Sequence, residues 1–247
     1  MKVLLYSINS RSIQSNLALY YLSEYASAKN PEVEFKCLES SINEPANFQL
    51  AQVITHKPDL LAISCYIWNI EATARLCSDL KKIAPKMKIL LGGHEVSHDP
   101  QIYLEQGICD YVITGEGEIP FARLIRHLQG YTEIENVESL VYLANDRVTS
   151  NSKANDIQPL DSIPSPYKGD LLDRPFVYYE VSRGCVYKCH FCLSALDRGT
   201  RFFSMERFYK DMQVILSKPR IKQVKFVDRT FNLNLKRTNE IFKFLRD

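Results

Sequence analysis

Short apolar segments alternate with helical segments over the first 130 residues, and this alternation limits the possible folds more than any other feature. Residues 59–65 (DLLAISC) form a continuous apolar run, which is typical of a strand buried on both faces of a parallel sheet. We predict further strands at residues 2–6, 33–38, 87–91 and 111–114, and helices at residues 17–25, 48–54, 70–83 and 119–128. Strands joined by helices favour right-handed crossovers and a doubly wound parallel sheet. We expect a five-stranded sheet in the flavodoxin-like order 2-1-3-4-5.

The chain changes character after residue 130. Residues 139–143 and 147–150 flank an Ala-Asn-Asp turn and predict a β-hairpin, after which four prolines follow in a polar segment. We predict strands at residues 176–181 and 221–227, and helices at residues 204–216, with Ser204 as N-cap, and 236–245. We therefore expect an α/β chain with a first domain at residues 1–130, a hairpin and linker at 131–175, and a second domain beginning at 176–247.

Composition excludes several classes of protein. With 45% hydrophobic and 24% charged residues, and only 9 Gly and 11 Pro in 247 residues, the chain is not disordered, collagen-like or of low complexity. No apolar run approaches the roughly 18 residues that a membrane helix needs. The apolar start of the chain is too short for a signal peptide and is typical of a strand. We expect a cytoplasmic protein without a membrane partner.

The net charge of +2 conceals an asymmetry along the chain. From Arg174 to the C-terminus there are 16 Lys and Arg against 7 Asp and Glu, a balance of +9, so the remainder carries −7. A basic half can face an anionic ligand or an acidic partner, and it can equally be an ordinary solvated surface. The sequence allows a nucleic-acid partner but does not favour one.

Three of the seven cysteines, Cys185, Cys189 and Cys192, lie within eight residues in a C-x3-C-x2-C spacing. This crowding indicates a metal site in a reducing compartment rather than a disulfide framework. A closed zinc site needs four ligands, and His190 lies between two of the cysteines, where it would strain to reach the same ion. Three thiolates can instead hold three corners of a [4Fe–4S] cluster and leave the fourth iron open. We favour the cluster over a structural zinc or a chance grouping.

The cysteine loop resembles the signature of the radical S-adenosylmethionine (SAM) superfamily. The spacing C-x3-C-x-aromatic-C follows directly on a predicted strand, with Gly184 before the first cysteine and Phe191 before the last. The resemblance implies that the open iron binds the amino and carboxylate groups of SAM. It also implies that an electron from the cluster cleaves SAM to a 5′-deoxyadenosyl radical, and that Phe191 lies against the adenine. A plain core aromatic is the alternative for Phe191.

The resemblance also implies a polar group for the SAM ammonium at the end of the second predicted strand of this domain. Asp228 is the candidate, because a cationic amine needs an acceptor. The alternative is a cap or a surface ion pair with Arg229. The usual Gly-Gly-Glu form is absent here.

Residues 1–130 resemble the cobalamin-binding domain that precedes the radical SAM core in one large class. The resemblance rests on Ile63-Ser64 at a strand end, on the double glycine within residues 91–97 and on residues 115–118. These segments follow the carboxyl ends of strands, where ligands bind in doubly wound sheets, and the glycines would let a bulky ligand approach the backbone. The cobalamin-binding residues that it implies are Ser12, Ser64, Gly92, Gly93, His94, Gly115, Glu116 and Gly117.

One departure from that class concerns the lower face of cobalt. Many cobalamin domains carry Asp-x-His-x-x-Gly after the first strand, and its histidine ligates cobalt. Here residues 9–17 (NSRSIQSNL) contain no histidine, and His94 lies where the nucleotide tail is expected to pass. Because soft transition metals favour imidazole over amide or hydroxyl ligands, we expect base-off cobalamin with water or nothing below cobalt. The alternative is a domain that has lost cobalamin and only packs on the core.

Together the two resemblances imply a cobalamin-dependent radical SAM enzyme of an uncharacterised subgroup. We expect methyl transfer to an unactivated carbon, or another radical modification of an unknown substrate. The cofactors would be a [4Fe–4S] cluster, SAM and cobalamin, and the reducing partner a protein such as flavodoxin or ferredoxin. A radical SAM core normally has more strand–helix units than fit after residue 175, so we also expect a chain truncated within that core.

Two alternatives remain open. A methylthiotransferase-like enzyme acting on tRNA would suit the basic half of the chain, but it would use three further cysteines for a second cluster. Cys37, Cys65, Cys77 and Cys109 fall in apparent core positions, and we interpret them as small buried hydrophobic side chains. The other alternative is a non-catalytic cobalamin-binding module.

Overall fold

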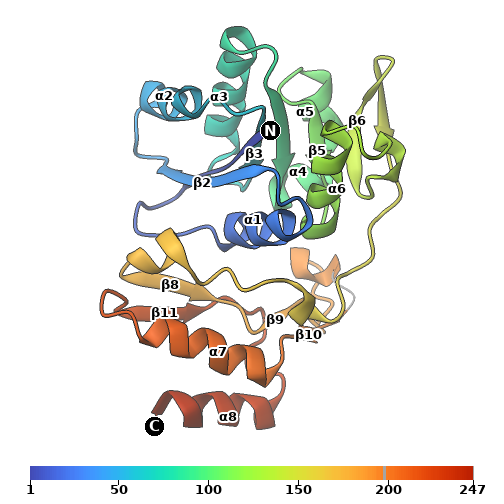
Figure 1. The fold of residues 1–247 in the computed structure, drawn as a ribbon. Helices are drawn as coiled ribbons and strands as arrows, with labels where there is room; N and C mark the ends of the chain where they lie inside the picture. Colours follow the sequence, from blue (N-terminus) through green and yellow to red (C-terminus); the bar gives the residue numbers. More distant parts are fainter. Residues whose placement is uncertain (197–198, 247) are drawn as a thin grey trace. The chain divides into compact units, whose positions relative to one another are not determined.

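The computed structural model describes residues 1–196 and 199–246, and its backbone divides into two units, Met1–Asp156 and Ile157–Asp247 (Figure 1). The second predicted domain, at residues 176–247, includes positions 197, 198 and 247, which lie outside the described residues. In the described part of the chain, no helix is both long and apolar enough to cross a membrane.

The first unit contains the predicted parallel strands in the predicted order. They are β1 (Lys2–Asn9), β2 (Glu34–Ser41), β3 (Leu60–Ser64), β4 (Lys88–Gly92) and β5 (Tyr111–Ile113). Their spatial order is β2-β1-β3-β4-β5, and each neighbouring pair is parallel. The flavodoxin-like arrangement is therefore confirmed, and the carboxyl ends of all these strands meet at one edge of the sheet.

The predicted hairpin extends this sheet, which corrects the expected strand number. β6 (Leu140–Ala144) pairs antiparallel with β5, and β7 (Arg147–Ser150) pairs antiparallel with β6. The sheet thus has seven strands among the described residues rather than five. Asn145 and Asp146 take φ angles of 50° and 59°, which a tight two-residue turn requires, so the chain returns at once beside β6.

Helices cover both faces of this sheet (Figure 1). They are α1 (Leu17–Lys29), α2 (Ala46–His56), α3 (Ile70–Ile83), α4 (His94–His98), α5 (Pro100–Glu105) and α6 (Glu118–Leu128), with the short 3-10 helix η1 (Ile134–Asn136) after them. Sequence analysis did not predict α4 and α5, because helices of one or two turns leave no periodic apolar signal.

The two faces of the sheet bury separate hydrophobic cores. Leu4, Tyr6 and Ile8 of β1 belong to one cluster, whereas Val3 and Leu5 belong to the other. Successive side chains of a strand point to opposite faces, so a strand covered on both faces must be apolar throughout. This requirement explains the continuous apolar runs in the sequence.

The second unit contains a strand–helix–strand–helix segment, β8-α7-β11-α8. Its elements are η2 (Leu160–Ser162), η3 (Gly169–Asp173), β8 (Phe176–Tyr179), β9 (Ser182–Arg183), η4 (Leu193–Leu196), β10 (Arg201–Phe202), α7 (Met205–Leu216), β11 (Gln223–Phe226) and α8 (Leu235–Arg246). β8 and β11 are parallel neighbours joined through α7, which is the repeating unit of a β/α barrel. β9 and β10 form a short antiparallel pair on either side of the cysteine loop.

Local signals set the ends and the packing of α7. Ser204 caps the helix as predicted, since its hydroxyl accepts a hydrogen bond of 3.0 Å from the Arg207 backbone N–H. The fully buried Phe208 makes edge contacts with Tyr179 on β8 and with Phe244 on α8. These aromatic contacts join the two helices and the strand pair into one core.

Candidate functional site

One row of residues marks the carboxyl edge of the first sheet. Ser7 is in register with Ser64, Ser64 with Gly92, and Gly92 with Ile113. The segments that follow these strands therefore leave the sheet side by side. In sheets of this type, ligands bind at this edge.

The two glycines after β4 have different surroundings. A Cβ added at Gly92 would meet only the carbonyl oxygen of Ile113, at 3.8 Å, which is an ordinary contact. A Cβ added at Gly93 would lie 2.5 Å from the carbonyl oxygen of Cys65, and the φ angle of Gly93 is +106°. Gly93 therefore has a packing role within the protein, whereas the space beside Gly92 is open to a ligand.

The loop after β5 supplies a second open stretch of backbone. Gly115 is exposed, and a Cβ there would meet no atom within 4 Å. Gly117 differs, because a Cβ there would lie 3.0 Å from the side chain of Leu22 on α1. Glu116 between them is half-buried. Of the two glycines in this loop, Gly115 therefore leaves its backbone more open to a ligand than Gly117 does.

The loop after β1 contains no histidine, and hydrogen bonds to Glu39 on β2 hold it in place. Asn9 donates a hydrogen bond of 2.5 Å to the Glu39 carboxylate on β2. Glu39 also accepts hydrogen bonds from the Asn16 backbone N–H at 2.8 Å and the Tyr20 hydroxyl at 2.7 Å. Ser12 is exposed in this loop. The loop is thus held by a carboxylate and by amides.

Sequence analysis missed an exposed aromatic segment after β3. The Tyr66 and Trp68 rings stack with centroids 4.4 Å apart, and Ile67 is 78% exposed. The buried Asn69 side chain holds the segment, since it accepts from the Tyr66 N–H at 2.8 Å and donates to the Ile8 carbonyl at 3.0 Å. Exposed apolar side chains gathered in this way mark a contact surface.

His94 lies beside this aromatic segment. It begins α4, it is exposed, and its ring centroid lies 6.5 Å from that of Tyr66. A signal was available in the sequence, because Tyr66, Ile67 and Trp68 stand between a buried strand and a helix, where polar turn residues are usual.

The carboxyl edge fits a large, partly apolar ligand such as cobalamin. It combines open backbone at Gly92 and Gly115 with exposed apolar side chains at Ile67 and Trp68. The hydroxyl of Ser64 lies on the same row, at the end of β3. Binding sites of this kind are mostly apolar with a few placed polar groups.

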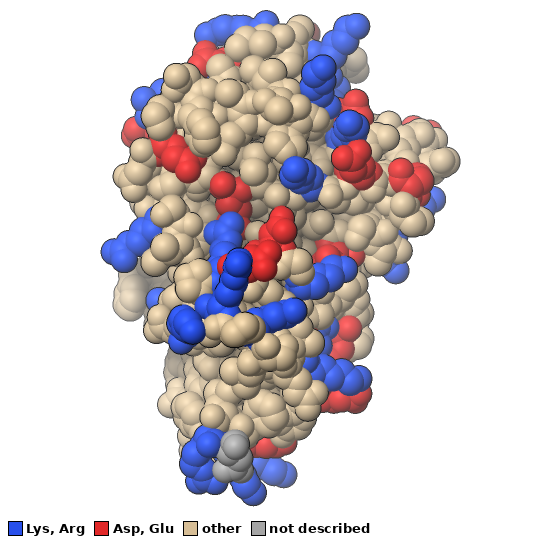
Figure 2. Space-filling view, turned by 60° about the vertical axis from the view of Figure 1, so that its left-hand side comes forward, with Lys and Arg blue, Asp and Glu red and all other residues tan. Residues whose placement is uncertain are grey.

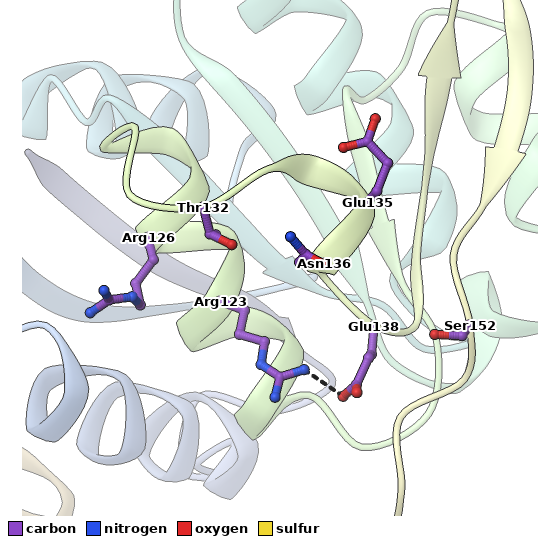
Figure 3. Close-up of a pocket in the computed structure, with 7 residues that line it drawn as sticks. All are labelled: Arg123, Arg126, Thr132, Glu135, Asn136, Glu138 and Ser152. Carbon is purple, nitrogen blue, oxygen red and sulfur yellow. Dashed lines mark ion pairs between the residues drawn. The ribbon is translucent and has the colours of Figure 1, made fainter.

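A separate pocket in the first unit contains none of these residues. Its volume is about 390 Å³, and it is lined by Arg123, Arg126, Thr132, Glu135, Asn136, Glu138 and Ser152 (Figure 3). Arg123 and Glu138 form an ion pair of 2.8 Å. The lining carries charges of both signs and neither thiol nor imidazole, so this pocket is not part of the candidate site.

The three cysteines of the second unit lie in a loop after β9. Gly184 turns the chain out of the strand with a φ angle of +87°. Cys185 is only 7% exposed, whereas Cys189 and Cys192 are exposed, and all three thiols are free. The Cys192 N–H donates to the Cys189 carbonyl at 3.0 Å, which forms a turn between the two exposed cysteines.

These thiols do not converge on one point. Among residues 1–196 and 199–246, no three His, Cys, Asp or Glu side chains are gathered as a single metal ion requires. A structural zinc ion needs four ligands converging on one ion. The loop therefore offers three free thiols, one fewer than the four ligands of a closed zinc site.

The two residues predicted to contact SAM differ in exposure, since Phe191 is exposed and Asp228 is half-buried. Phe191 is 94% exposed, which contradicts the alternative that it is a core aromatic. Asp228, just after β11, accepts hydrogen bonds from the Val181 N–H at 3.3 Å and from the Ser182 hydroxyl. Asp228 therefore ties the end of β11 to the strand that leads into the cysteine loop.

Burial gives Asp228 a pH-dependent effect on stability. Burial raises the pKa of the Asp228 carboxyl, and the hydrogen bonds that it accepts oppose this shift. The folded state thus holds the proton more tightly than the unfolded chain, whose aspartates titrate at about 3.9. The stabilisation is complete below that pH and is lost as the pH rises through the folded pKa.

We predict that Asp228→Asn removes this pH dependence. The free energy of unfolding of the variant relative to the wild type should rise as the pH increases above about 4, because only the wild type must then carry a buried charge. Urea unfolding at a series of pH values measures it. A difference that stays constant over this range would contradict the prediction.

Three of the four remaining cysteines are fully buried in the core. Cys65, Cys77 and Cys109 are buried and Cys37 is half-buried, so the prediction of small buried side chains is confirmed for the first three. Burial raises the pKa of the Cys109 thiol to about 12 and raises those of Cys65 and Cys77 strongly. Because metals bind the thiolate, such thiols are poor ligands.

Comparison with known proteins follows the division seen in the structure. Residues 3–125 match the model of the B12 binding domain. The chain is 29% identical over 238 residues to an uncharacterized methyltransferase of Pyrococcus horikoshii, covering 91% of this chain and 51% of that protein. It is 28% identical over 168 residues to the cobalamin-dependent radical SAM methyltransferase TokK of Streptomyces tokunonensis, covering 63% of this chain and 24% of that protein. Residues 3–125 thus match a B12 binding domain, and the chain is similar to a cobalamin-dependent radical SAM methyltransferase.

The fold of the chain extends the same comparison. The solved structure of the cobalamin-dependent SAM radical enzyme OxsB, with aqua-cobalamin and SAM bound, matches with a TM-score of 0.81 at 20% identity. The match covers 97% of this chain and 35% of that one. The chain thus spans about half of the Pyrococcus protein and smaller fractions of the other two.

Proposed function

We propose that this chain binds cobalamin at the carboxyl edge of its first sheet, and a [4Fe–4S] cluster with SAM at Cys185, Cys189 and Cys192. Its reaction would be methyl transfer, or another radical modification of a substrate not yet identified. One observation carries the proposal: a single chain contains both an open sheet edge beside Gly92 and an exposed loop with three free thiols. The names of the Pyrococcus and Streptomyces relatives support methyl transfer.

The residues of the cysteine loop would bind and position the cluster and SAM. When bound there, the cluster supplies the electron that cleaves SAM reductively to a 5′-deoxyadenosyl radical. Phe191 is exposed and free to lie against the adenine. Asp228 already accepts two hydrogen bonds, so it would meet the SAM ammonium through its remaining lone pairs.

Residues of the first unit would hold cobalamin without an imidazole ligand. Ser64, Gly92 and Gly115 would line the ligand, with Ser12, Gly93, Glu116 and Gly117 in the surrounding loops. Since the loop after β1 contains no histidine, it would offer a bound cobalamin amide, hydroxyl and guanidinium side chains but no imidazole. His94 would lie along the nucleotide tail.

The surface charge of the second unit suits an acidic electron donor such as flavodoxin or ferredoxin. Lys188, Lys210, Lys222, Lys225 and Lys236 are exposed, and Figure 2 shows how Lys and Arg side chains reach the surface. Basic surfaces speed the approach of acidic partners and align them. Such a donor would deliver the electron that the reaction needs.

The methylthiotransferase alternative is weaker on the structure. It requires a second cluster held by three further cysteines. Cys65, Cys77 and Cys109 are buried in the same hydrophobic core cluster with raised thiol pKa values, so they are poor cluster ligands. Iron analysis separates the two functions, since one cluster gives about 4 and two give about 8 iron atoms per chain.

Gly92→Val tests the cobalamin site without disturbing the fold. A Cβ at this position makes only an ordinary contact, and valine suits a strand end, so the free energy of unfolding should change by less than about 1 kcal/mol. The added side chain would fill the space beside the β4 backbone. We expect cobalamin binding to weaken at least about tenfold, as measured by equilibrium dialysis with the visible spectrum as readout.

His94→Ala is the matched variant for the same site. It should leave the visible spectrum of bound cobalamin unchanged, because this histidine does not ligate cobalt in our proposal. Unchanged affinity in Gly92→Val would place the site elsewhere. A nitrogen-ligated cobalt signal in electron paramagnetic resonance that disappears in His94→Ala would overturn the proposed lower face.

A further inference from the structure

We propose that the Thr230 hydroxyl donates a hydrogen bond to the sulfur of Cys185 and thereby raises the reduction potential of the cluster bound by this loop. The inference rests on the proposed function, because it requires the cluster. It assigns Thr230, which follows β11, a role as a positioning residue for one corner of that cluster.

The contact joins two segments that are far apart in the sequence. The Thr230 Oγ1 atom lies 3.6 Å from the Cys185 Sγ atom, which is hydrogen-bond distance for sulfur. Two residues earlier, the Asp228 carboxylate holds the Val181 N–H and the Ser182 hydroxyl. The segment after β11 therefore contacts the cysteine loop and the residues before it at two positions, Asp228 and Thr230. These contacts hold Thr230 opposite Cys185.

The direction of the hydrogen bond follows from the state of the sulfur. In the free thiol either atom can donate. A cysteine that ligates iron is a thiolate and has no proton on sulfur, so only the threonine hydroxyl can donate. Cluster binding would thus convert an ambiguous contact into a charge-assisted hydrogen bond to sulfur.

A hydrogen bond from the protein should affect the buried sulfur of Cys185 more than it would affect the exposed sulfurs of the other two cysteines. Cys185 is 7% exposed, whereas Cys189 and Cys192 are exposed. Water can donate to an exposed sulfur and can replace a lost protein donor there. At the buried sulfur of Cys185 the Thr230 hydroxyl has no such replacement.

The effect on the cluster is electrostatic. Reduction adds one electron, and part of that charge is carried by the sulfurs. A hydrogen bond to sulfur stabilises the reduced cluster more than the oxidised one, so it raises the reduction potential. The protein would thereby make the cluster easier to reduce by its electron donor.

Thr230→Val tests the inference, because valine has nearly the same shape and lacks the hydroxyl. We expect the variant to bind iron and sulfide like the wild type. At a fixed ambient potential, its ratio of reduced to oxidised cluster should fall about threefold to tenfold, where tenfold corresponds to about 59 mV for one electron. A redox titration followed by electron paramagnetic resonance measures this ratio.

Two further variants separate the hydroxyl from general damage. Thr230→Ser keeps a hydroxyl and should restore the wild-type ratio. Thr238→Val removes a hydroxyl of the same unit that donates to the Phe231 and Asn234 carbonyls, and it should leave the ratio unchanged. An unchanged ratio in Thr230→Val with a full cluster would overturn the inference.

A second measurement keeps the test decisive if Thr230→Val binds no cluster. In the wild type, the iron–sulfur stretching frequencies in resonance Raman spectra should shift on transfer to deuterium oxide, because an exchangeable proton bonds to sulfur. Absence of a shift would overturn the inference. A wild type that binds no cluster at all would overturn both the proposed function and the role of Thr230, and that outcome is visible without any variant.

Discussion

Alanine in place of Cys185, Cys189 or Cys192 is expected to abolish the broad absorbance near ~400 nm of the anaerobically reconstituted protein. Each thiolate would hold a separate iron, so the loss of one leaves a second corner of the cluster uncapped. The cluster should then fail to assemble or should be lost on desalting. Iron analysis of the desalted protein measures the loss.

Cys37→Ala provides the control for these three variants. Cys37 is only half-buried and lies on β2, outside the loop, so its replacement should keep iron content and absorbance. Full iron content in all three loop variants would contradict the assignment of these cysteines as cluster ligands. Loss of iron in Cys37→Ala as well would point to general damage rather than to lost ligands.

Gly93→Ala is expected to destabilise the first unit by about 2–5 kcal/mol. A Cβ at this position would lie 2.5 Å from the Cys65 carbonyl oxygen and 3.1 Å from the Cys65 nitrogen, and the atoms it meets are backbone atoms that cannot rotate away. The φ angle of +106° adds the usual cost of a left-handed conformation for a residue with a Cβ. Urea unfolding followed by circular dichroism measures the loss.

Gly115→Ala separates the two causes. Gly115 has a φ angle of +78°, but a Cβ there would meet no atom within 4 Å. This variant should therefore lose only about 1–2 kcal/mol, the backbone part of the effect. Equal losses of unfolding free energy in the two variants would show that the close approach of the Cys65 backbone to Gly93 does not add to the destabilisation.

Much of the fold was predictable because its signals are local. The buried run at residues 59–65 and the helical spacing at residues 70–83 each indicate one element, and the right-handed crossover rule then orders the strands. The hairpin was also predicted from its turn. Its pairing with β5 was not, since the contact of Tyr111 with Tyr142 joins segments that no local pattern connects.

The same distinction applies to the candidate site. The spacing of the three cysteines is a local pattern, so the sequence alone was enough to predict a site in this loop. The contact of Thr230 with Cys185 and the hydrogen bond from the Tyr66 N–H to Asn69 depend on tertiary structure and side-chain direction. Gly93 was predicted for the ligand, and only the approach of the Cys65 carbonyl oxygen revealed its packing role.

An anaerobic ultraviolet–visible spectrum of the reconstituted chain, recorded with and without cobalamin and paired with iron analysis, tests the central claim most directly. We predict about 4 iron atoms per chain with a broad band near ~400 nm. We also predict that about one equivalent of cobalamin stays bound after desalting and shows its own absorption spectrum. A chain that retains neither iron nor cobalamin after reconstitution would contradict the account.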